Sequence, residues 1–314
     1  MRILRFRSFR MNRNFISSNS AVLGLRGIVT SCRAVVLQRF GGPEVLELRP
    51  NVEVPDLKSN EVLVRARAVS INPLDTRMRL GYGRSIFDHI YLSYWAAILV
   101  EASAIPFAAL TAWRALKSTA RITEGQRLLV VGGGGAVGFT AIQLAVAAGC
   151  HVTTTCGSQS VGRMLAAGAE QAVDYTAEDI ELAIKGKFDA VLDTIGGPET
   201  ERISINFLKR AGHYMTLQGE AASLADKYGL AAGLPLATAL LLKKQIQYRY
   251  SHGIEYWWTY MRADSEGLHE IRKLSEAGKL KVPVEKTFPI TQVREAHEAK
   301  DRRHVPGKVV LEID

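Results

Sequence analysis

Short apolar runs separated by turn residues fill residues 33–67. The runs are rich in β-branched side chains and alternate in part between apolar and polar positions, and a Gly-Gly-Pro turn at 41–43 interrupts them. This pattern predicts short strands joined by turns. Residues 70–83, which contain an Asn-Pro pair and two later glycines, are predicted to form loop and turn.

From residue 127 onward, apolar runs alternate with helical stretches. Residues 128–132, 151–156 and 188–197 are strand-like, and helical patterns at 136–148 and 161–167 lie between them. Strands that alternate with helices predict βαβ crossovers and a parallel sheet. After residue 279 the chain returns to short strand-like pieces. The predicted fold class is α/β, with a doubly wound parallel sheet of the Rossmann type.

The sequence Gly133-x-Gly135-x-x-Gly138 stands between a predicted strand and a predicted helix. In this position the motif is typical of dinucleotide binding. The first glycine permits a tight turn, the second lets a diphosphate touch the backbone, and the third lets helix and strand pack closely. Free N–H groups at the start of the helix then face the anion. A purely structural glycine-rich turn is the alternative.

The end of the second strand of the sheet bears on the choice of cofactor. A site for NAD uses an Asp or Glu there to hold the ribose 2′-hydroxyl. Here the segment 156–160 contains Gly157 and Ser158 but no acid, and Arg163 follows. Hydroxyl, backbone N–H and guanidinium donors suit a 2′-phosphate, since a hydrogen bond to a charged group contributes about 1.5–3 kcal/mol. The predicted cofactor is therefore NADPH. The alternative for Arg163 alone is a solvated helix residue.

The positive charge of the chain is concentrated at its start. Net charge is +9, and residues 1–33 hold seven arginines and no acid, so only +2 remains for the rest of the chain. This distribution argues against a nucleic-acid-binding body. An Arg-rich, acid-free leader that runs into serines predicts an organelle transit peptide over residues 1–32 and a location in the mitochondrion. A basic disordered tail is the alternative.

Composition excludes several other classes of protein. With 314 residues, 47% hydrophobic and 23% charged, the chain is typical of a globular protein of about two domains. Three cysteines without metal-ligand spacing, and seven histidines without a cluster, predict no disulfide framework and no metal site. The apolar run at 229–242 is shorter than the roughly 20 residues of a membrane span. It predicts a buried helix or the wall of an apolar pocket, with membrane-surface contact as the alternative.

Seven segments together carry a family resemblance. They are the glycine motif and the segments 40–46 (FGGPEVL), 70–75 (SINPLD), 109–113 (ALTAW), 173–175 (VDY), 193–197 (DTIGG) and 307–310 (GKVV). In these segments the chain resembles the zinc-free quinone oxidoreductases of the medium-chain dehydrogenase/reductase superfamily. The resemblance implies a GroES-like β-barrel formed by the first and last parts of the chain, a nucleotide-binding domain between them, and no metal.

The resemblance also implies which residues form the site. Asn72 and Asp75 would lie beside the nicotinamide and the substrate as the catalytic residues, and His304 and Val305 would reach the cofactor from the returning segment. Turn formation by Asn72 and Asp75, and core packing by Tyr175, are the alternatives. The other residues expected at the cofactor are Gly133, Gly134, Gly135, Ala136, Val137, Gly138, Gly157, Ser158, Tyr175, Thr194 and Leu217.

One departure from the family pattern lies between residues 87 and 101. Relatives carry a longer segment with several barrel strands there, whereas this chain has only the apolar stretch 88–100. A barrel without those strands has unpaired edges. We therefore expect the GroES-like part, residues 33–100, to be truncated after about residue 87. A NAD(P)-binding domain at 101–278 and a C-terminal return at 279–314 would follow. A helix that covers the open edge is the alternative.

The activity implied by the resemblance is zinc-independent hydride transfer from NADPH to a quinone or an activated enone, with the hydride chemistry residing in the cofactor. Two alternatives stay open. One is reduction of 2-alkenals. The other is a catalytically impaired NADPH-binding or interaction protein, because the missing segment would normally cover the nicotinamide. The expected partner is a small-molecule quinone or enone and not nucleic acid. Further candidates are a membrane surface, a second copy in a homodimer and a reticulon-type protein.

Overall fold

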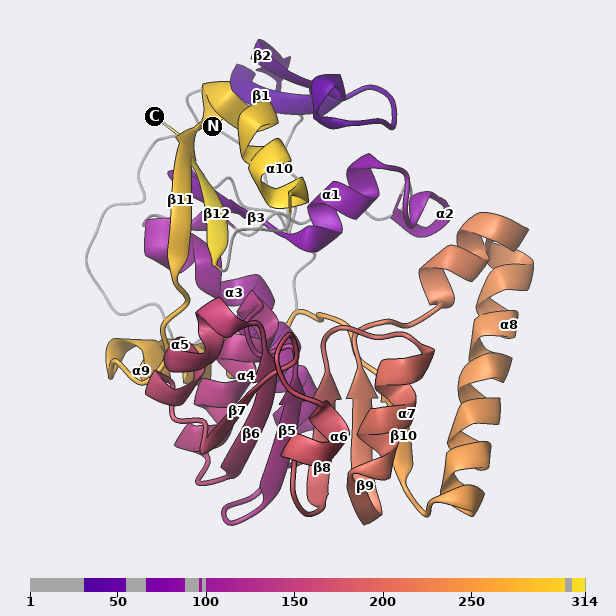
Figure 1. Cartoon of the computed structure of the whole chain (residues 1–314). Coiled ribbons are helices and arrows are strands. Elements are labelled where there is room, and N and C mark those ends of the chain that lie inside the picture. The colour runs from indigo at the N-terminus through magenta and orange to yellow at the C-terminus, as the bar shows by residue number, and fades with distance from the viewer. Residues whose placement is uncertain (1–30, 55–65, 88–95, 98–99, 303–306, 314) are drawn as a thin grey trace, which may run out of the picture.

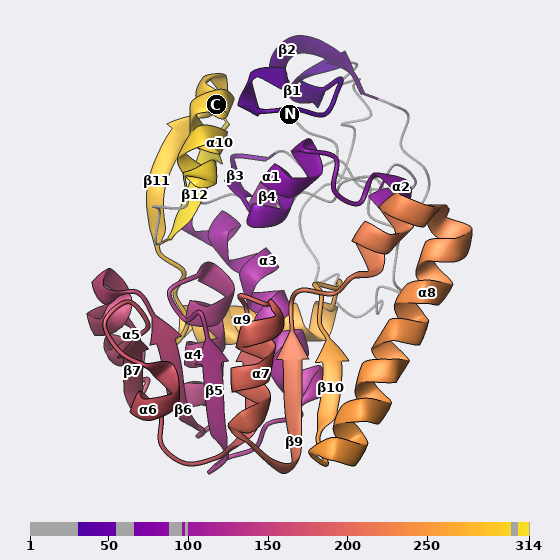
Figure 2. The ribbon, with the colours of Figure 1, turned by 45° about the vertical axis from the view of Figure 1, so that its right-hand side comes forward.

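The computed structural model describes residues 31–54, 66–87, 96–97, 100–302 and 307–313. Figures 1 and 2 show a central sheet with helices on both faces and a smaller group of strands and helices beyond one end of it. Nearly all of the predicted leader and most of the 88–100 junction lie outside the described residues, as do His304 and Val305.

Six parallel strands form the central sheet, as the alternating pattern predicts. Their order is β10-β9-β8-β5-β6-β7, so strands that follow β5 in sequence lie on both sides of it. The aromatic-rich strand β10 adds an edge that the pattern does not predict. The strands are β5 (Arg127–Val131), β6 (His151–Cys156), β7 (Gln171–Asp174), β8 (Phe188–Asp193), β9 (Leu208–Thr216) and β10 (Glu255–Trp258).

Alternate side chains of β5 face two separate cores. Leu128 and Val130 pack with α3, α4 and α9 on one face, whereas Leu129 and Val131 pack with α7 and α8 on the other. A strand that is buried on both faces therefore reads as an unbroken apolar run. The helices are α3 (Val100–Trp113), α4 (Ala136–Ala147), α5 (Val161–Ala166), α6 (Ile180–Ala183), α7 (Pro198–Asn206), α8 (Ala221–Ser251) and α9 (Ser265–Glu276).

The smaller group joins the two ends of the chain. Strand β12 pairs antiparallel with β3 and parallel with β11, and β4 completes this sheet. Strands β1 and β2 form a separate hairpin. The elements are β1 (Ser31–Leu37), β2 (Leu46–Glu53), β3 (Ala68–Ile71), α1 (Pro73–Arg79), α2 (Arg84–Phe87), β4 (Ala96–Ala97), β11 (Val284–Pro289), α10 (Val293–Asp301) and β12 (Lys308–Glu312).

The expectation of loop and turn at residues 70–83 is wrong, because much of this segment is helical. Helix α1 begins directly after Asn72, with Pro73 at its first position. The Asn72 N–H donates to Asp75 Oδ2 at 2.7 Å, which satisfies a backbone donor at the start of the helix. The Asn-Pro and Asp residues that suggest a turn therefore act as helix-start signals.

The expectation that residues 229–242 are buried is also wrong. They belong to the long helix α8, which contacts the sheet along one stripe beside the edge strand β10 and leaves its other side open (Figure 2). Leu234, Leu236 and Leu242 are 41%, 40% and 51% exposed. Within the described part of the chain, no helix combines the length and the apolar character needed to cross a bilayer.

Candidate nucleotide-binding and active site

The loops at the carboxyl ends of five neighbouring strands bring most of the predicted cofactor residues together. The glycine loop follows β5, Gly157 and Ser158 follow β6, and Tyr175, Thr194 and Leu217 follow β7, β8 and β9. These ends point toward the smaller group of strands and helices (Figure 1). Because the strand order reverses at β5, this edge is where open α/β sheets bind their ligands.

The glycines of this loop do not all have the structural roles that the sequence predicts for them. The tight turn lies at Gly132, with φ +84°, and not at Gly133. A Cβ at Gly133 would lie 2.2 Å from Thr154 Oγ1 on β6, so this glycine permits close packing between strands. A Cβ at Gly138 would lie 2.4 Å from the Gly132 carbonyl oxygen, which is the close approach of helix and strand expected of the third glycine.

Gly135 leaves an open backbone surface at the start of α4. It is the residue before the first helical turn, and a Cβ placed there would meet only the Gly132 carbonyl oxygen, at 3.6 Å. No side chain in the described part of the chain caps this helix. The N–H groups at its start and the positive end of its dipole therefore suit an anion, and a dinucleotide's diphosphate fits this cradle.

The tip of β6 carries an acidic neighbour that the sequence reasoning missed. Ser158 donates its hydroxyl to Asp174, the last residue of β7, and lies 2.9 Å from Thr176 Oγ1. The hydrogen bonds from Ser158 and Thr176 lower the pKa of Asp174. The signal was available, because the carboxyl ends of adjacent parallel strands meet at one edge. An acid at the end of the third strand therefore lies beside the end of the second, as Asp174 does.

Arg163 lies between the glycine loop and the strand tip. Its Nη2 donates to the Gly134 carbonyl oxygen at 3.1 Å and to Ser160 Oγ at 3.4 Å, and its guanidinium carbon lies 5.5 Å from the centre of the Phe139 ring. Arg163 is therefore more than a solvated helix residue. Its cationic group joins the glycine loop to the tip of β6.

Two further predicted residues take up positions that fit a binding role. Tyr175 is 55% exposed, which excludes core packing, and a Cβ at Gly157 would lie 3.6 Å from its hydroxyl. Thr194 donates its hydroxyl to the Val131 carbonyl oxygen at 2.8 Å, so it ties the loop after β8 to the glycine loop.

The loop after β8 is held by a buried carboxylate. Asp193 accepts the backbone N–H groups of Ile195 at 2.9 Å and Gly196 at 2.8 Å, and the Tyr214 hydroxyl at 2.7 Å. Burial, and then the charge of Asp193, raises the pKa of Tyr214, so Tyr214 stays a donor. This network fixes the rim of the site, although sequence reasoning assigned Asp193 no role.

The smaller group of strands and helices supplies Asn72 and Asp75. Both belong to the start of α1, and Arg77 in the same helix donates to Gln218 Oε1 at 3.4 Å, directly after Leu217. Helix α1 therefore lies against the loop that follows β9. Lys308 on β12 donates its ammonium hydrogen to Asn72 Oδ1. Sequence reasoning included this lysine in a family segment but did not place it beside Asn72.

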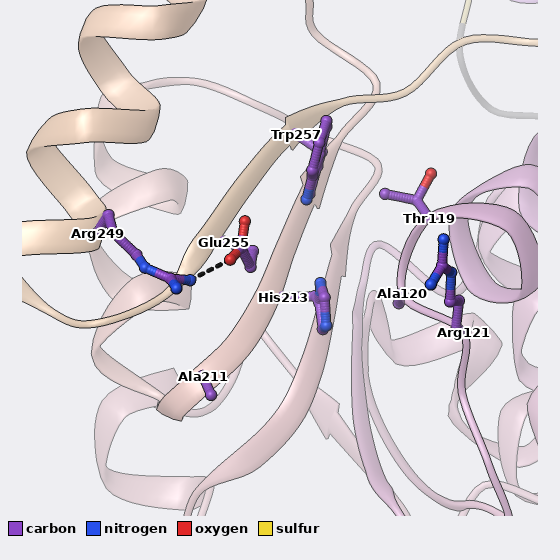
Figure 3. Close-up of a pocket in the computed structure, with 8 residues that line it drawn as sticks. All are labelled: Thr119, Ala120, Arg121, Ala211, His213, Arg249, Glu255 and Trp257. Atoms are coloured by element: carbon purple, nitrogen blue, oxygen red, sulfur yellow. Dashed lines mark hydrogen bonds and ion pairs between the residues drawn. The ribbon is translucent and has the colours of Figure 1, made fainter.

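A cavity lies away from these residues (Figure 3). His213 on β9 is level with Ala190, which pairs with Leu128 near the start of β5, so the cavity is toward the amino ends of the strands. Burial lowers the pKa of His213. The cavity has a volume of about 410 Å³ and is lined by Thr119, Ala120, Arg121, Ala211, His213, Arg249, Glu255 and Trp257. None of the predicted site residues in the described part of the chain lines it.

Comparison with known proteins identifies the family. Residues 167–311 match the family model described as zinc-binding dehydrogenase. The zebrafish protein named NAD(P)H oxidoreductase RTN4IP1, mitochondrial, is 30% identical over 89% of this chain and 91% of its own length. The chain belongs to the family of this oxidoreductase. The mouse protein of the same name is 29% identical over 92% of both chains.

The family lies within the medium-chain dehydrogenase/reductase superfamily, so the predicted resemblance is confirmed. The solved quinone oxidoreductase from Coxiella burnetii superposes with a TM-score of 0.71 at 24% identity, covering 90% of this chain and 99% of that one, which confirms the α/β fold. As a member of this family the chain is an oxidoreductase. The mitochondrial location predicted from the leader agrees with the names of these relatives and is confirmed.

Two further observations bear on what the chain retains of this family. The zebrafish alignment extends over 354 positions, more than the 314 residues of this chain, so the relative has residues without a counterpart here. Among the described residues, no group of three or more His, Cys, Asp or Glu side chains is placed to hold a metal ion.

Proposed function

We propose that this chain transfers a hydride from NADPH to a quinone or an activated enone without the help of zinc. The observation that carries the proposal is the open backbone at Gly135, surrounded by the loops that follow five parallel strands. The names of the relatives support a nicotinamide cofactor. The solved Coxiella burnetii protein, described as a quinone oxidoreductase, and a tomato relative named 2-methylene-furan-3-one reductase, 28% identical over 57% of this chain, support the substrate class.

In this mechanism, bound NADPH supplies a hydride from its nicotinamide. The N–H groups at the start of α4 hold the diphosphate, and the loops at Gly157, Tyr175 and Thr194 orient the rest of the dinucleotide. Asn72 orients a carbonyl group near the nicotinamide, and Asp75 anchors Asn72. We assign the proton that follows the hydride to solvent, because a reduced quinone oxygen is exposed to water once it leaves the site.

The choice of NADPH over NADH depends on three side chains at the strand tips. Arg163 favours a 2′-phosphate, whereas the carboxylate of Asp174, which accepts the hydroxyl hydrogen of Ser158, opposes it. We propose that Arg163 outweighs Asp174, since the guanidinium lies between the loop and the tip, whereas the charge of Asp174 is already met by the hydroxyl groups of Ser158 and Thr176.

The experiment that tests the proposal combines binding and turnover. Calorimetry with NADPH and NADH measures whether and which nucleotide binds, and a steady-state assay with short-chain quinones measures turnover. Heat on NADPH binding followed by quinone-dependent oxidation is expected. Absence of heat with both nucleotides would refute the proposal.

A second candidate function is NADPH binding without efficient turnover. It is favoured by the alignment of 354 positions against a chain of 314, which supports a GroES-like part truncated after about residue 87. We propose the division into residues 33–100, 101–278 and 279–314 on the same basis. Binding of NADPH with no oxidation by any quinone, enone or 2-alkenal would favour this function. An Arabidopsis relative named NADPH-dependent alkenal/one oxidoreductase makes 2-alkenals worth including.

We also propose that α8 contacts an anionic membrane surface. Six large apolar side chains of this helix are exposed. After Asp226 the helix contains no acidic residue, but it does contain basic residues such as Lys227 and Lys243. Apolar exposure with basic neighbours suits an interface helix. The apolar side chains are Tyr228, Leu234, Leu236, Leu242, Ile246 and Tyr250.

Vesicle sedimentation tests the membrane proposal. Wild-type protein is expected to bind vesicles that contain anionic lipid and to lose this binding in Ile246→Glu, whereas Leu182→Glu, an exposed site on α6, should bind normally. Equal binding by both variants would contradict the proposal. A homodimer and a reticulon-type partner are proposals from the family alone, and sedimentation velocity would reveal the dimer.

A further inference from the structure

A buried lysine lies beside the predicted catalytic asparagine. Strand β12 pairs antiparallel with β3 so that Val309 is opposite Ile71, which brings the preceding residue of β12, Lys308, next to Asn72 after the end of β3. The Lys308 ammonium donates to Asn72 Oδ1. On the other side, Asn72 Nδ2 donates to Asp75 Oδ2 at 3.2 Å. The Asn72 side chain is thus held between a lysine and an aspartate.

These two neighbours leave the amide only one orientation. An ammonium group can only donate hydrogen bonds and an ionised carboxylate can only accept them, so the oxygen of Asn72 must face Lys308 and the nitrogen must face Asp75. Nδ2 carries two hydrogens and uses one on Asp75. Within the described residues the other hydrogen has no acceptor, so Asn72 can offer it as a donor to a ligand.

The surroundings of Lys308 do not explain why a lysine occupies this position. Its side chain is 1% exposed, its ammonium lies 5.7 Å from the centre of the Phe107 ring, and among the described residues the group it donates to is an amide and not a carboxylate. Burial lowers the pKa of Lys308 to about 7, with the charge of Lys300 acting in the same direction and that of Asp75 against it. An apolar side chain would avoid this desolvation cost.

We propose that Lys308 is a positioning residue of the active site. Together with Asp75 it fixes the Asn72 amide so that its remaining N–H donates to a carbonyl oxygen of the reaction complex. That oxygen belongs either to the carboxamide of the nicotinamide or to the quinone or enone. The inference rests on the proposed function, since it places this site at the nicotinamide end of the bound dinucleotide.

The first test separates positioning from folding. Lys308→Met keeps the length and apolar part of the side chain but removes the donor, and Lys286→Met on the neighbouring strand β11 is the matched control at an exposed site. Lys308→Met is expected to lower kcat at least about tenfold, the effect of one lost hydrogen bond of ordinary strength in the transition state. Its Kd for NADPH should stay within about twofold if the diphosphate cradle supplies most of the binding. Unchanged kcat in a folded Lys308→Met protein would overturn the proposal.

The second test needs no turnover and remains available if Lys308→Met does not fold. The side-chain ¹⁵N–¹H signals of Asn72 in the wild-type protein are assigned by their loss in Asn72→Asp. If the carboxamide is the acceptor, one of the two signals should shift when NADPH is added. If the substrate is the acceptor, that signal should shift only when a quinone is added to the protein together with the oxidised cofactor. Signals that no ligand moves would refute the donor role.

The outcomes distinguish failure of the inference from failure of the proposed function. If the wild-type protein binds NADPH with a shift of the Asn72 signal but reduces no quinone, the positioning role stands and the proposed activity is refuted. If the wild-type protein and Lys308→Met reduce quinones equally well, the proposed activity stands and the positioning role is refuted.

Discussion

Replacing Gly135 with aspartate is expected to abolish nucleotide binding without harming the fold. The backbone at this position has φ −78° and ψ 161°, which any residue adopts, and the new Cβ would meet only the Gly132 carbonyl oxygen, at 3.6 Å. Aspartate is also a preferred residue at the start of a helix, where its carboxylate accepts N–H groups of the first turn. The variant should therefore unfold at or above the temperature of the wild-type protein.

The same features make aspartate incompatible with a diphosphate. The carboxylate takes up N–H groups that the ligand would use, and it adds a negative charge to the cradle. At about 5 Å from one phosphate charge and an effective dielectric constant of about 20, the repulsion is about 3 kcal/mol, which weakens binding more than about a hundredfold.

Isothermal calorimetry with NADPH and thermal unfolding of the same samples form the assay. Ala147→Asp is the control, because it adds the same charge to an exposed position at the other end of α4. That position is about 18 Å from Gly135 along the helix. The control should bind NADPH like the wild-type protein. If Gly135→Asp binds NADPH within about twofold of wild type, the diphosphate does not lie at the start of α4 and the reasoning is wrong.

Three further predictions concern stability, pH and cofactor choice. Gly138→Ala should cost about 2 kcal/mol and lower Tm by about 4–8 °C, because its Cβ would lie 2.4 Å from a backbone oxygen. Burial, and then the charge of Arg79, lowers the pKa of His297 from 6.5 to about 4. The unfolded chain therefore binds a proton in this window that the folded chain does not, so the free energy of unfolding should fall by about 3 kcal/mol as pH falls from 6.5 to 4. Urea titrations of the wild-type protein and of His297→Leu at several pH values would detect this. An equal dependence of the unfolding free energy on pH in the two proteins would contradict it. Asp174→Asn should raise kcat/KM for NADPH severalfold while leaving that for NADH nearly unchanged; a parallel change in both would place the 2′-phosphate elsewhere.

The central sheet could be predicted from the sequence because its determinants are local. Strands β5 and β8 are largely apolar and buried on both faces, and glycines follow each of them within a few residues. The helix at α1 was missed for an equally local reason. Asn72, Pro73 and Asp75 occur both in turns and at helix starts, and only the residues that follow decide between the two.

Exposure of α8 and the surroundings of single site residues could not be predicted in this way. Leu236 and Leu242 have the character of core residues, and they are exposed because α8 lies beside an edge strand and touches the sheet on one side only. The acid at the strand tips was missed because Asp174 ends the third strand and not the second.

The sequence by itself determined the alternation of strands and helices from β5 to β8, the glycine loop and the family, because each depends on residues that are neighbours along the chain. Only the tertiary structure decided which side chains share the site. The pairing of β12 with β3 places Lys308 against Asn72 across 236 residues of sequence. No local pattern records that contact, since it exists only where the two ends of the chain meet in one sheet.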